Sequence, residues 1–226
     1  MDAMMENNIR QEQIESFGRL MAGFSHDMKN HLGIIRESNG LMGDILEMGG
    51  LGEDEISLQR LKKSISAIER RVVITANMFH HLSGFAHRAD APYSSFQLND
   101  LISEECIFLE RFSRLKQIEI VQELGDGLLA IYNDPALLQH VLYRLYIQCL
   151  EQIESGHSLI IITGQEGENI VITFRLPAAL QADLENWFGD TLLAAIEKLN
   201  GTLEQSENTQ DHTDVRLIIA SLPIEE

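Results

Sequence analysis

The sequence has little cysteine and no long apolar run. Its 226 residues include two cysteines, Cys106 and Cys149, both in apolar stretches of helical character. This argues against a disulfide framework and indicates reduced thiols in a core. No apolar run approaches the roughly 18 residues that would span a membrane, and the polar start MDAMMENNIRQEQ has no signal-peptide core. We therefore expect a cytoplasmic protein with no membrane partner.

Basic residues are also scarce. The chain has 17 Lys and Arg against 35 Asp and Glu, a net charge of −18. Residues 1–90 hold 10 Lys and Arg against 13 Asp and Glu, whereas residues 91–226 hold 7 against 22. So acidic a region repels nucleic-acid backbones and nucleoside triphosphates at long range, although acidic surface also serves solubility alone. We expect no nucleic-acid partner.

A long amphipathic pattern covers residues 14–46. Apolar side chains recur every three or four positions, which predicts a helix with one buried stripe. His26 lies off the stripe, with Asp27 about 100° round the helix and Asn30 one turn further along the same face. An imidazole placed there faces water or a docking protein. The stripe consists of Ile14, Phe17, Met21, Phe24, Met28, Leu32, Ile35, Met42 and Ile45.

The segment FSHDMKNHLGIIRES, residues 24–38, resembles the H-box of sensor histidine kinases. In that family an acid follows the phosphoacceptor histidine, and Asn or Thr stands four residues after it. The resemblance implies that His26 accepts a phosphoryl group, that Asp27 orients the ring or takes its proton, and that Asn30 positions water for dephosphorylation. A histidine that titrates near neutrality is a usable nucleophile. Without further context, a His beside an Asp on a helix is more often a solvated pair.

A second apolar stripe supplies that context. Residues 56–86 have heptad spacing, which suits the seam of a helical bundle. The sequence GGLGEDE, residues 49–55, predicts a turn between the two helices. Two long striped helices cannot bury their seam alone, so we expect an antiparallel hairpin that pairs with a second copy in a four-helix homodimer. The stripe consists of Leu58, Leu61, Ile65, Ile68, Val72, Thr75, Phe79, Leu82 and Ala86.

The expected hairpin brings further residues to the level of His26. Folding it about residue 52 places Asn77, Met78 and His81 there, as candidates to border the site. The pair His80 and His81 suggests a metal site, but adjacent histidines point in different directions on a helix and no Cys or carboxylate cluster completes a ligand set. We expect neither a bound metal nor a cofactor in this chain.

The hairpin is less acidic than the remainder, which favours it as the surface for a partner with an acidic phosphorylation pocket. Such charges are also common on any solvated helix. The predicted partner-binding residues are Lys29, Gly33, Arg36, Arg70 and Arg71.

A change of pattern predicts a second domain. The heptads stop at HRADAPYSS, residues 87–95, so we expect domains at 1–90 and 91–226. The second domain is predicted to hold a helix opened at Asn99 and Asp100, strands over 118–124 and 128–133, and a helix begun by Asp134 and Pro135. A hairpin over 159–176, a helix ended at Asn200 and Gly201, and two strands complete it. The fold class is α+β, with a two-layer α/β sandwich after the helical hairpin.

This order of elements resembles the ATP-binding domain of histidine kinases over most of residues 96–223. The nucleotide-binding residues of the family are missing. Its N-box asparagines, which hold magnesium and phosphate, are replaced by Arg144 and Gln148, and its two alanines by Cys149 and Gln152. No aspartate with spaced glycines follows VITF, and the second glycine box shrinks to Gly189 before Asp190. One glycine beside an acid is a poor phosphate cradle.

The resemblance therefore implies a histidine phosphotransferase of a phosphorelay. His26 would shuttle a phosphoryl group between the aspartates of response-regulator receiver domains, which supply the Mg²⁺, without ATP. Two alternatives stay open. The chain could be a pseudokinase or phosphatase-type regulator that docks on response regulators or kinases, with Asn30 orienting water in the phosphatase form. It could also be an active sensor-kinase core whose N-box tolerates Gln148.

Overall fold

A computed structural model of the chain describes residues 2–48, 55–177, 184–208 and 212–221. It divides into two compact units. The hairpin unit is Met21–Gly84, and the sandwich unit combines Met1–Leu20 with Phe85–Glu226. The predicted domain division at residue 90 stays a prediction. The sandwich unit includes the first twenty residues of the chain, which the sequence analysis did not anticipate.

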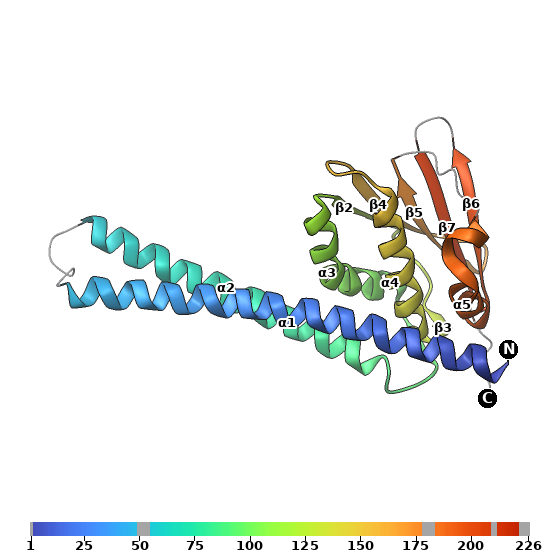
Figure 1. Ribbon diagram of the computed structural model, residues 1–226, viewed down its shortest axis with the longest axis horizontal. Coiled ribbons are helices and arrows are strands. Elements are labelled where there is room, and N and C mark those ends of the chain that lie inside the picture. The colour runs from blue at the N-terminus through green and yellow to red at the C-terminus, as the bar shows by residue number, and fades with distance from the viewer. Residues whose placement is uncertain (1, 49–54, 178–183, 209–211, 222–226) are drawn as a thin grey trace. The chain divides into compact units, whose positions relative to one another are not determined.

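Two long helices form the N-terminal part, as predicted. Helix α1 runs over Ala3–Glu47 and α2 over Glu55–His87, and the predicted turn lies mostly outside the described residues. Phe24 packs edge-on against Phe79, with 5.5 Å between the ring centroids. Further along, Arg71 Nη1 lies 3.3 Å from His31 Nδ1. These two contacts show that α1 and α2 are antiparallel (Figure 1).

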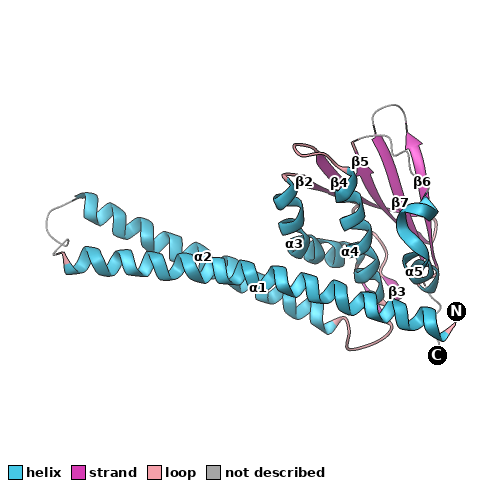
Figure 2. Cartoon of the chain, viewed as in Figure 1, coloured by secondary structure: helices cyan, strands magenta, loops and turns pink. Residues whose placement is uncertain are grey.

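The sandwich unit contains a five-stranded mixed sheet in the order β2-β4-β5-β7-β6. Only the pair β2 and β4 is parallel. Helices α3, α4 and α5 lie against one face of this sheet (Figure 2), and β1 pairs with β3 in a separate two-stranded sheet. This is the predicted α+β class. The bounds are β1 Ser94–Phe96, α3 Leu98–Lys116, β2 Glu119–Leu124, β3 Ile131–Asn133, α4 Pro135–Gln152, β4 Ser158–Glu166, β5 Asn169–Leu176, α5 Leu184–Lys198, β6 Gly201–Asn208 and β7 His212–Ala220.

The ends of α4 and α5 follow the sequence signals. The Asp134 carboxylate accepts a hydrogen bond from the Leu137 N–H at 2.9 Å, and Pro135 occupies the first helical position. This satisfies one of the free N–H groups at the helix start. After α5, Asn200 adopts a left-handed φ of 54° and leads directly into β6. Both predicted helix ends are therefore confirmed.

The predicted start of the helix after residue 96 is wrong. Helix α3 begins at Leu98, and residues 94–96 form strand β1 instead. Asn99 lies inside the helix, where its amide donates to the Gly125 carbonyl at 2.8 Å and accepts from the Thr163 hydroxyl at 2.8 Å. Asn99 therefore ties α3 to β4 and is not a cap. This contact between distant segments is invisible in the local sequence.

The core of the sandwich unit lies between the helices and the sheet. Tyr146, Phe174 and Phe188 are its largest fully buried side chains. Cys106 and Cys149 are both free and buried, as predicted. Burial raises the pKa of the Cys106 thiol to about 12, with a smaller contribution from the Glu105 carboxylate, so this thiol is inert at neutral pH.

Candidate functional site

The predicted phosphoacceptor and its two partners lie together on the surface of α1. The His26 side chain is 55% exposed, whereas that of Asp27 is 18% exposed. The His26 Nδ1 atom lies 3.4 Å from Asp27 Oδ1 and 3.2 Å from the Asn30 amide nitrogen. The helix repeat accounts for this cluster, because residues i and i+4 share a face.

The two neighbours of Nδ1 influence the tautomer of the ring differently. A carboxylate accepts a hydrogen bond, so Asp27 favours a proton on Nδ1 and a lone pair on Nε2. An amide nitrogen donates, so Asn30 favours the other tautomer. The carboxylate is the partner that suits nucleophilic attack through Nε2, while the amide holds the ring in place when the proton has moved.

Helix α2 supports this part of α1 on both sides of His26. The Phe24–Phe79 contact lies before it, and the contact between His31 and Arg71 lies after it. The sequence analysis missed His31 as a residue that links the two helices. The predicted proximity of Asn77, Met78 and His81 to His26 stays a prediction.

The predicted partner-binding residues all belong to the hairpin unit. Lys29, Arg36 and Arg70 are exposed, and Gly33 is half-buried with open space beside its Cα. Arg71 differs, because it is half-buried and forms a hydrogen bond with His31. Its contact within the hairpin gives it a structural role in addition to the predicted one.

The apolar stripe of α2 is largely uncovered within a single chain. Leu58, Ile65, Val72 and Phe79 stand seven residues apart, and their exposed fractions are 48%, 54%, 52% and 53%. Leu32 of α1 is also 57% exposed. By contrast, Phe24 and Met28 are buried by contacts within the chain. A continuous line of half-exposed apolar residues is typical of a helix that packs against a partner.

The residues that replace the N-box asparagines contact other parts of the same chain. The Arg144 guanidinium forms an ion pair with Glu12 of α1. The Gln148 amide donates to the carbonyl of Trp187 at 3.0 Å. Neither contact leaves the side chain directed at a nucleotide. Close to this contact, Phe188 is buried with an exposed fraction of 2%, and Trp187 is half-buried beside it.

A second contact joins α4 to α1 close to this ion pair. The His140 Nδ1 atom lies 3.0 Å from the Ser16 hydroxyl. Burial, aided by the positive charge of Arg144, lowers the pKa of His140 to about 4, so the ring is neutral at pH 7. The sequence analysis missed Glu12 and Ser16. Their spacing of four residues on α1 is the only local sign that they share a face.

The segment that corresponds to the second glycine box is short. Gly189 interrupts α5 with φ 72° and ψ 158°, a conformation that is essentially restricted to glycine. The neighbouring Asp190 is exposed. Residues 178–183, which precede α5, lie outside the described residues.

Metal and membrane features are absent from the described part of the chain. No group of three or more His, Cys, Asp or Glu residues there could hold a metal ion. Within the same residues, no helix combines the length and apolar character needed to cross a bilayer.

Comparison with known sequences gives a consistent result. No protein-family model matches the chain. It is 23% identical over 158 residues to the signal transduction histidine-protein kinase AtoS of Escherichia coli K12, covering 70% of this chain and 24% of that kinase. It is 25% identical over 157 residues to the sensor histidine kinase ZraS of E. coli O157:H7, covering 70% of this chain and 32% of ZraS. The chain thus spans a third or less of the length of these relatives.

Solved structures agree with the sequence relatives. The chain matches the histidine kinase AdeS of Acinetobacter baumannii with a TM-score of 0.50 and 15% identity, covering 87% of this chain and 98% of that one. It matches the catalytic domain of the histidine kinase ThkA with a TM-score of 0.51 and 17% identity, covering 58% and 97%. The chain is histidine-kinase-like. A structure of ThkA in complex with the response regulator TrrA also matches, with a TM-score of 0.50, 16% identity and coverage of 98% and 68%.

Proposed function

We propose that this histidine-kinase-like chain is a phosphotransferase of a two-component phosphorelay that works without ATP. One observation carries the proposal. The H-box cluster of His26, Asp27 and Asn30 is intact on the surface, whereas Arg144 and Gln148, at the N-box positions, make contacts within the chain. Arginine has no oxygen to offer a metal ion, so the two residues provide at most the Gln148 side-chain oxygen where the family has the oxygens of two asparagines.

The proposed reaction needs only a histidine and a receiver aspartate. The Nε2 lone pair of His26 attacks the phosphorus of an aspartyl phosphate, so that a P–N bond forms and the P–O bond to the aspartate breaks. The aspartate leaves as a carboxylate, and its charge is stabilised by the Mg²⁺ of the receiver. Asp27 accepts the hydrogen bond from Nδ1–H while Nε2 attacks. The reverse sequence with a second receiver completes the relay and consumes no nucleotide.

Response-regulator receivers are the proposed partners. The ThkA neighbour was solved with a response regulator, which supports this class of partner for a chain of the same fold. The exposed cations Lys29 and Arg36 lie three and ten residues from His26 on α1. They are suited to the acidic pocket of a receiver. Gly33, between them, has no side chain and would allow close approach of the receiver.

A homodimer completes the proposed assembly. The half-exposed line of Leu58, Ile65, Val72 and Phe79 on α2 is the surface that a second copy would cover. Two hairpins packed along this line form a four-helix bundle. A cytoplasmic location is proposed with it, since receivers act there.

The deciding experiment is a phosphotransfer assay on the full chain and on His26→Ala. Each protein is given either labelled ATP with Mg²⁺ or a receiver domain already phosphorylated on its aspartate. We expect label on the wild-type chain from the receiver, none from ATP, and none on His26→Ala. Label from ATP would favour the active-kinase alternative instead.

A phosphatase role has a specific observation in its favour, the position of Asn30 beside the His26 ring. It would release inorganic phosphate from the receiver and leave no label on the chain. Asn30→Ala separates the two activities, because a relay needs His26 as acceptor, whereas phosphatase activity needs the amide that orients water. Receiver binding without either reaction would indicate a docking regulator.

A further inference from the structure

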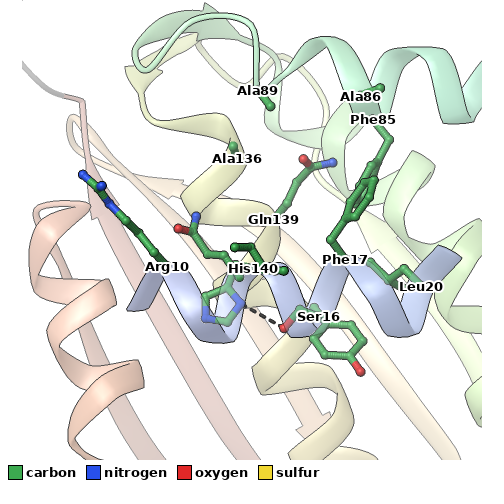
Figure 3. A pocket seen from close by; sticks show the side chains of 13 residues that line it. Arg10, Ser16, Phe17, Leu20, Phe85, Ala86, Ala89, Ala136, Gln139 and His140 are labelled. Carbon is green, nitrogen blue, oxygen red and sulfur yellow. Dashed lines mark hydrogen bonds between the residues drawn. The ribbon is translucent and has the colours of Figure 1, made fainter. Parts of the chain in front are cut away.

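The sandwich unit contains a cavity that the proposed phosphotransfer does not use. It lies between residues 10–20 of α1, the end of α2 and the first half of α4 (Figure 3). Its volume is about 470 Å³. Pockets for small ligands have volumes of about 300–1,000 Å³. The apolar part of its wall includes Phe17, Leu20, Phe85 and Tyr143.

Two polar side chains of α4 line the same cavity, and each has one buried nitrogen atom without a hydrogen-bond partner. Gln139 is only 5% exposed, and its amide nitrogen has no hydrogen-bond partner. The His140 Nε2 atom is also buried without a hydrogen-bond partner, while Nδ1 contacts Ser16. A buried donor left unpaired is costly, so native proteins pair most of them with protein, water or a ligand.

The charge at the cavity favours an anion. Arg10 is the only charged residue among those that line it, in a chain with a net charge of −18. Its one acidic neighbour, Glu6, lies 3.4 Å from Arg10 and also 3.4 Å from Lys198. Two cations therefore share one carboxylate at this edge. His140 is neutral at pH 7 and adds no charge. The Glu12 carboxylate, 4.0 Å from the His140 Nε2 atom, is paired with Arg144.

We propose that this cavity binds a small anionic amphiphile. Its apolar body would lie against Phe17, Leu20 and Phe85, its anionic group would lie toward Arg10, and an oxygen would accept from the Gln139 amide once that side chain turns into the cavity. The proposal is independent of the phosphotransfer reaction.

The test uses two fluorescent probes on the full chain. One is 1-anilinonaphthalene-8-sulfonate, which has an apolar body and one anionic group. The other is N-phenyl-1-naphthylamine, which has the same ring system without the sulfonate. We expect saturable binding of the sulfonate probe at one site for each chain, with decanoate as a competitor.

Two pairs of variants locate the site. Ala89→Phe fills the cavity from an exposed position, and Ala91→Phe is its control because Ala91 is exposed and does not line the cavity. Arg10→Ala removes the cation at the edge, and Arg60→Ala removes an exposed cation of the hairpin unit. We expect Ala89→Phe to weaken both probes about tenfold or more. Arg10→Ala should weaken only the sulfonate probe, about twofold to fivefold. Both controls should bind as the wild type does.

Three results would overturn the proposal. Probe binding that persists in Ala89→Phe would place the probe elsewhere, for example on the open apolar stripe of α2. Equal loss of both probes in Arg10→Ala would exclude recognition of the anion. A change from dimer to monomer in Ala89→Phe, seen by light scattering while circular dichroism is unchanged, would show that a second copy fills the cavity. Phosphotransfer is measured in parallel, so its failure is distinguished from failure of the cavity.

Discussion

Two histidines show how differently the hairpin unit and the sandwich unit use the same side chain. His26 is 55% exposed and has a carboxylate and an amide beside Nδ1. The side chain of His140 is 2% exposed, contacts Ser16 and has its pKa lowered to about 4. The first is exposed in a polar setting and available to a partner, whereas the second is a neutral part of the packing between α1 and α4. Exposure decides which histidine can do chemistry.

The apolar residues of the two units differ in the same way. In the sandwich unit, Tyr146 and Phe174 are fully buried within one chain. In the hairpin unit, Ile65 and Val72 remain half-exposed at heptad positions. A helix–sheet layer can enclose its own core, but two antiparallel helices have too little surface to do so. In the proposed assembly a second copy covers this line of the hairpin, whereas the sandwich encloses its own core.

The largest expected effect tests the exposed histidine. His26→Ala should reduce phosphotransfer from a receiver by about a thousandfold or more, since it removes the nucleophile. The free energy of unfolding should change by only about 0.5 kcal/mol, because the side chain is exposed. Labelling and urea unfolding measure the two effects. His31→Ala, which loses the Arg71 contact and leaves His26, Asp27 and Asn30 in place, is the control, and loss of label there alone would contradict the assignment.

The next effect tests whether the open stripe of α2 is an interface. Val72→Asp should convert the dimer to a monomer, since a buried, unpaired charge costs about 3–5 kcal/mol. Val73→Asp introduces the same charge at an exposed position about 100° round the helix, and this variant should remain a dimer. Light scattering at micromolar concentration distinguishes them. Equal behaviour of the two variants would show that the stripe is not the interface.

A smaller effect tests the buried histidine through pH. In the unfolded chain His140 has a pKa near 6.5, and in the folded chain about 4, so the unfolded state binds the proton first as the pH falls. Stability is therefore lost between about pH 6.5 and pH 4. Between pH 7.5 and pH 5 the wild type should lose about 2 kcal/mol more than His140→Gln.

Urea unfolding at the two pH values measures this difference. The raised pKa of Glu105, caused mainly by burial, acts in the opposite direction in both proteins and cancels in the comparison. Identical pH dependence in the two proteins would mean that His140 is not buried in its neutral form.

The smallest expected effect concerns Gln148, which stands at an N-box position and forms a hydrogen bond within the sandwich unit. Gln148→Ala should lower the free energy of unfolding by about 1 kcal/mol, because it removes the hydrogen bond to the Trp187 carbonyl. Gln152→Ala, on the same helix at an exposed position, should change it by less than about 0.5 kcal/mol. Neither variant should change labelling of His26. An effect of Gln148→Ala on ATP binding would argue that the nucleotide site is still in use.

Much of the architecture could be predicted because it depends on local pattern. The apolar periodicity of residues 14–46 and 56–86 predicted the two helices, and Asp134 with Pro135 predicted the start of α4. The error at Asn99 has the opposite cause. Asn is common at helix starts because its side chain can cap the helix. Here the Asn99 side chain instead forms two hydrogen bonds, to Gly125 and Thr163, which are 26 and 64 residues away.

The sequence by itself determined the H-box cluster, because residues 26, 27 and 30 are close enough along one helix to meet in any fold that keeps it. It also set Arg144 and Gln148 at the positions that, in the resemblance to histidine kinases, correspond to the N-box asparagines. Only the tertiary structure decided what these replacements do, through Glu12 and the Trp187 carbonyl. Contacts between α4 and residues more than thirty positions away depend on how the elements pack. Helical periodicity describes a single element and carries no information about such packing.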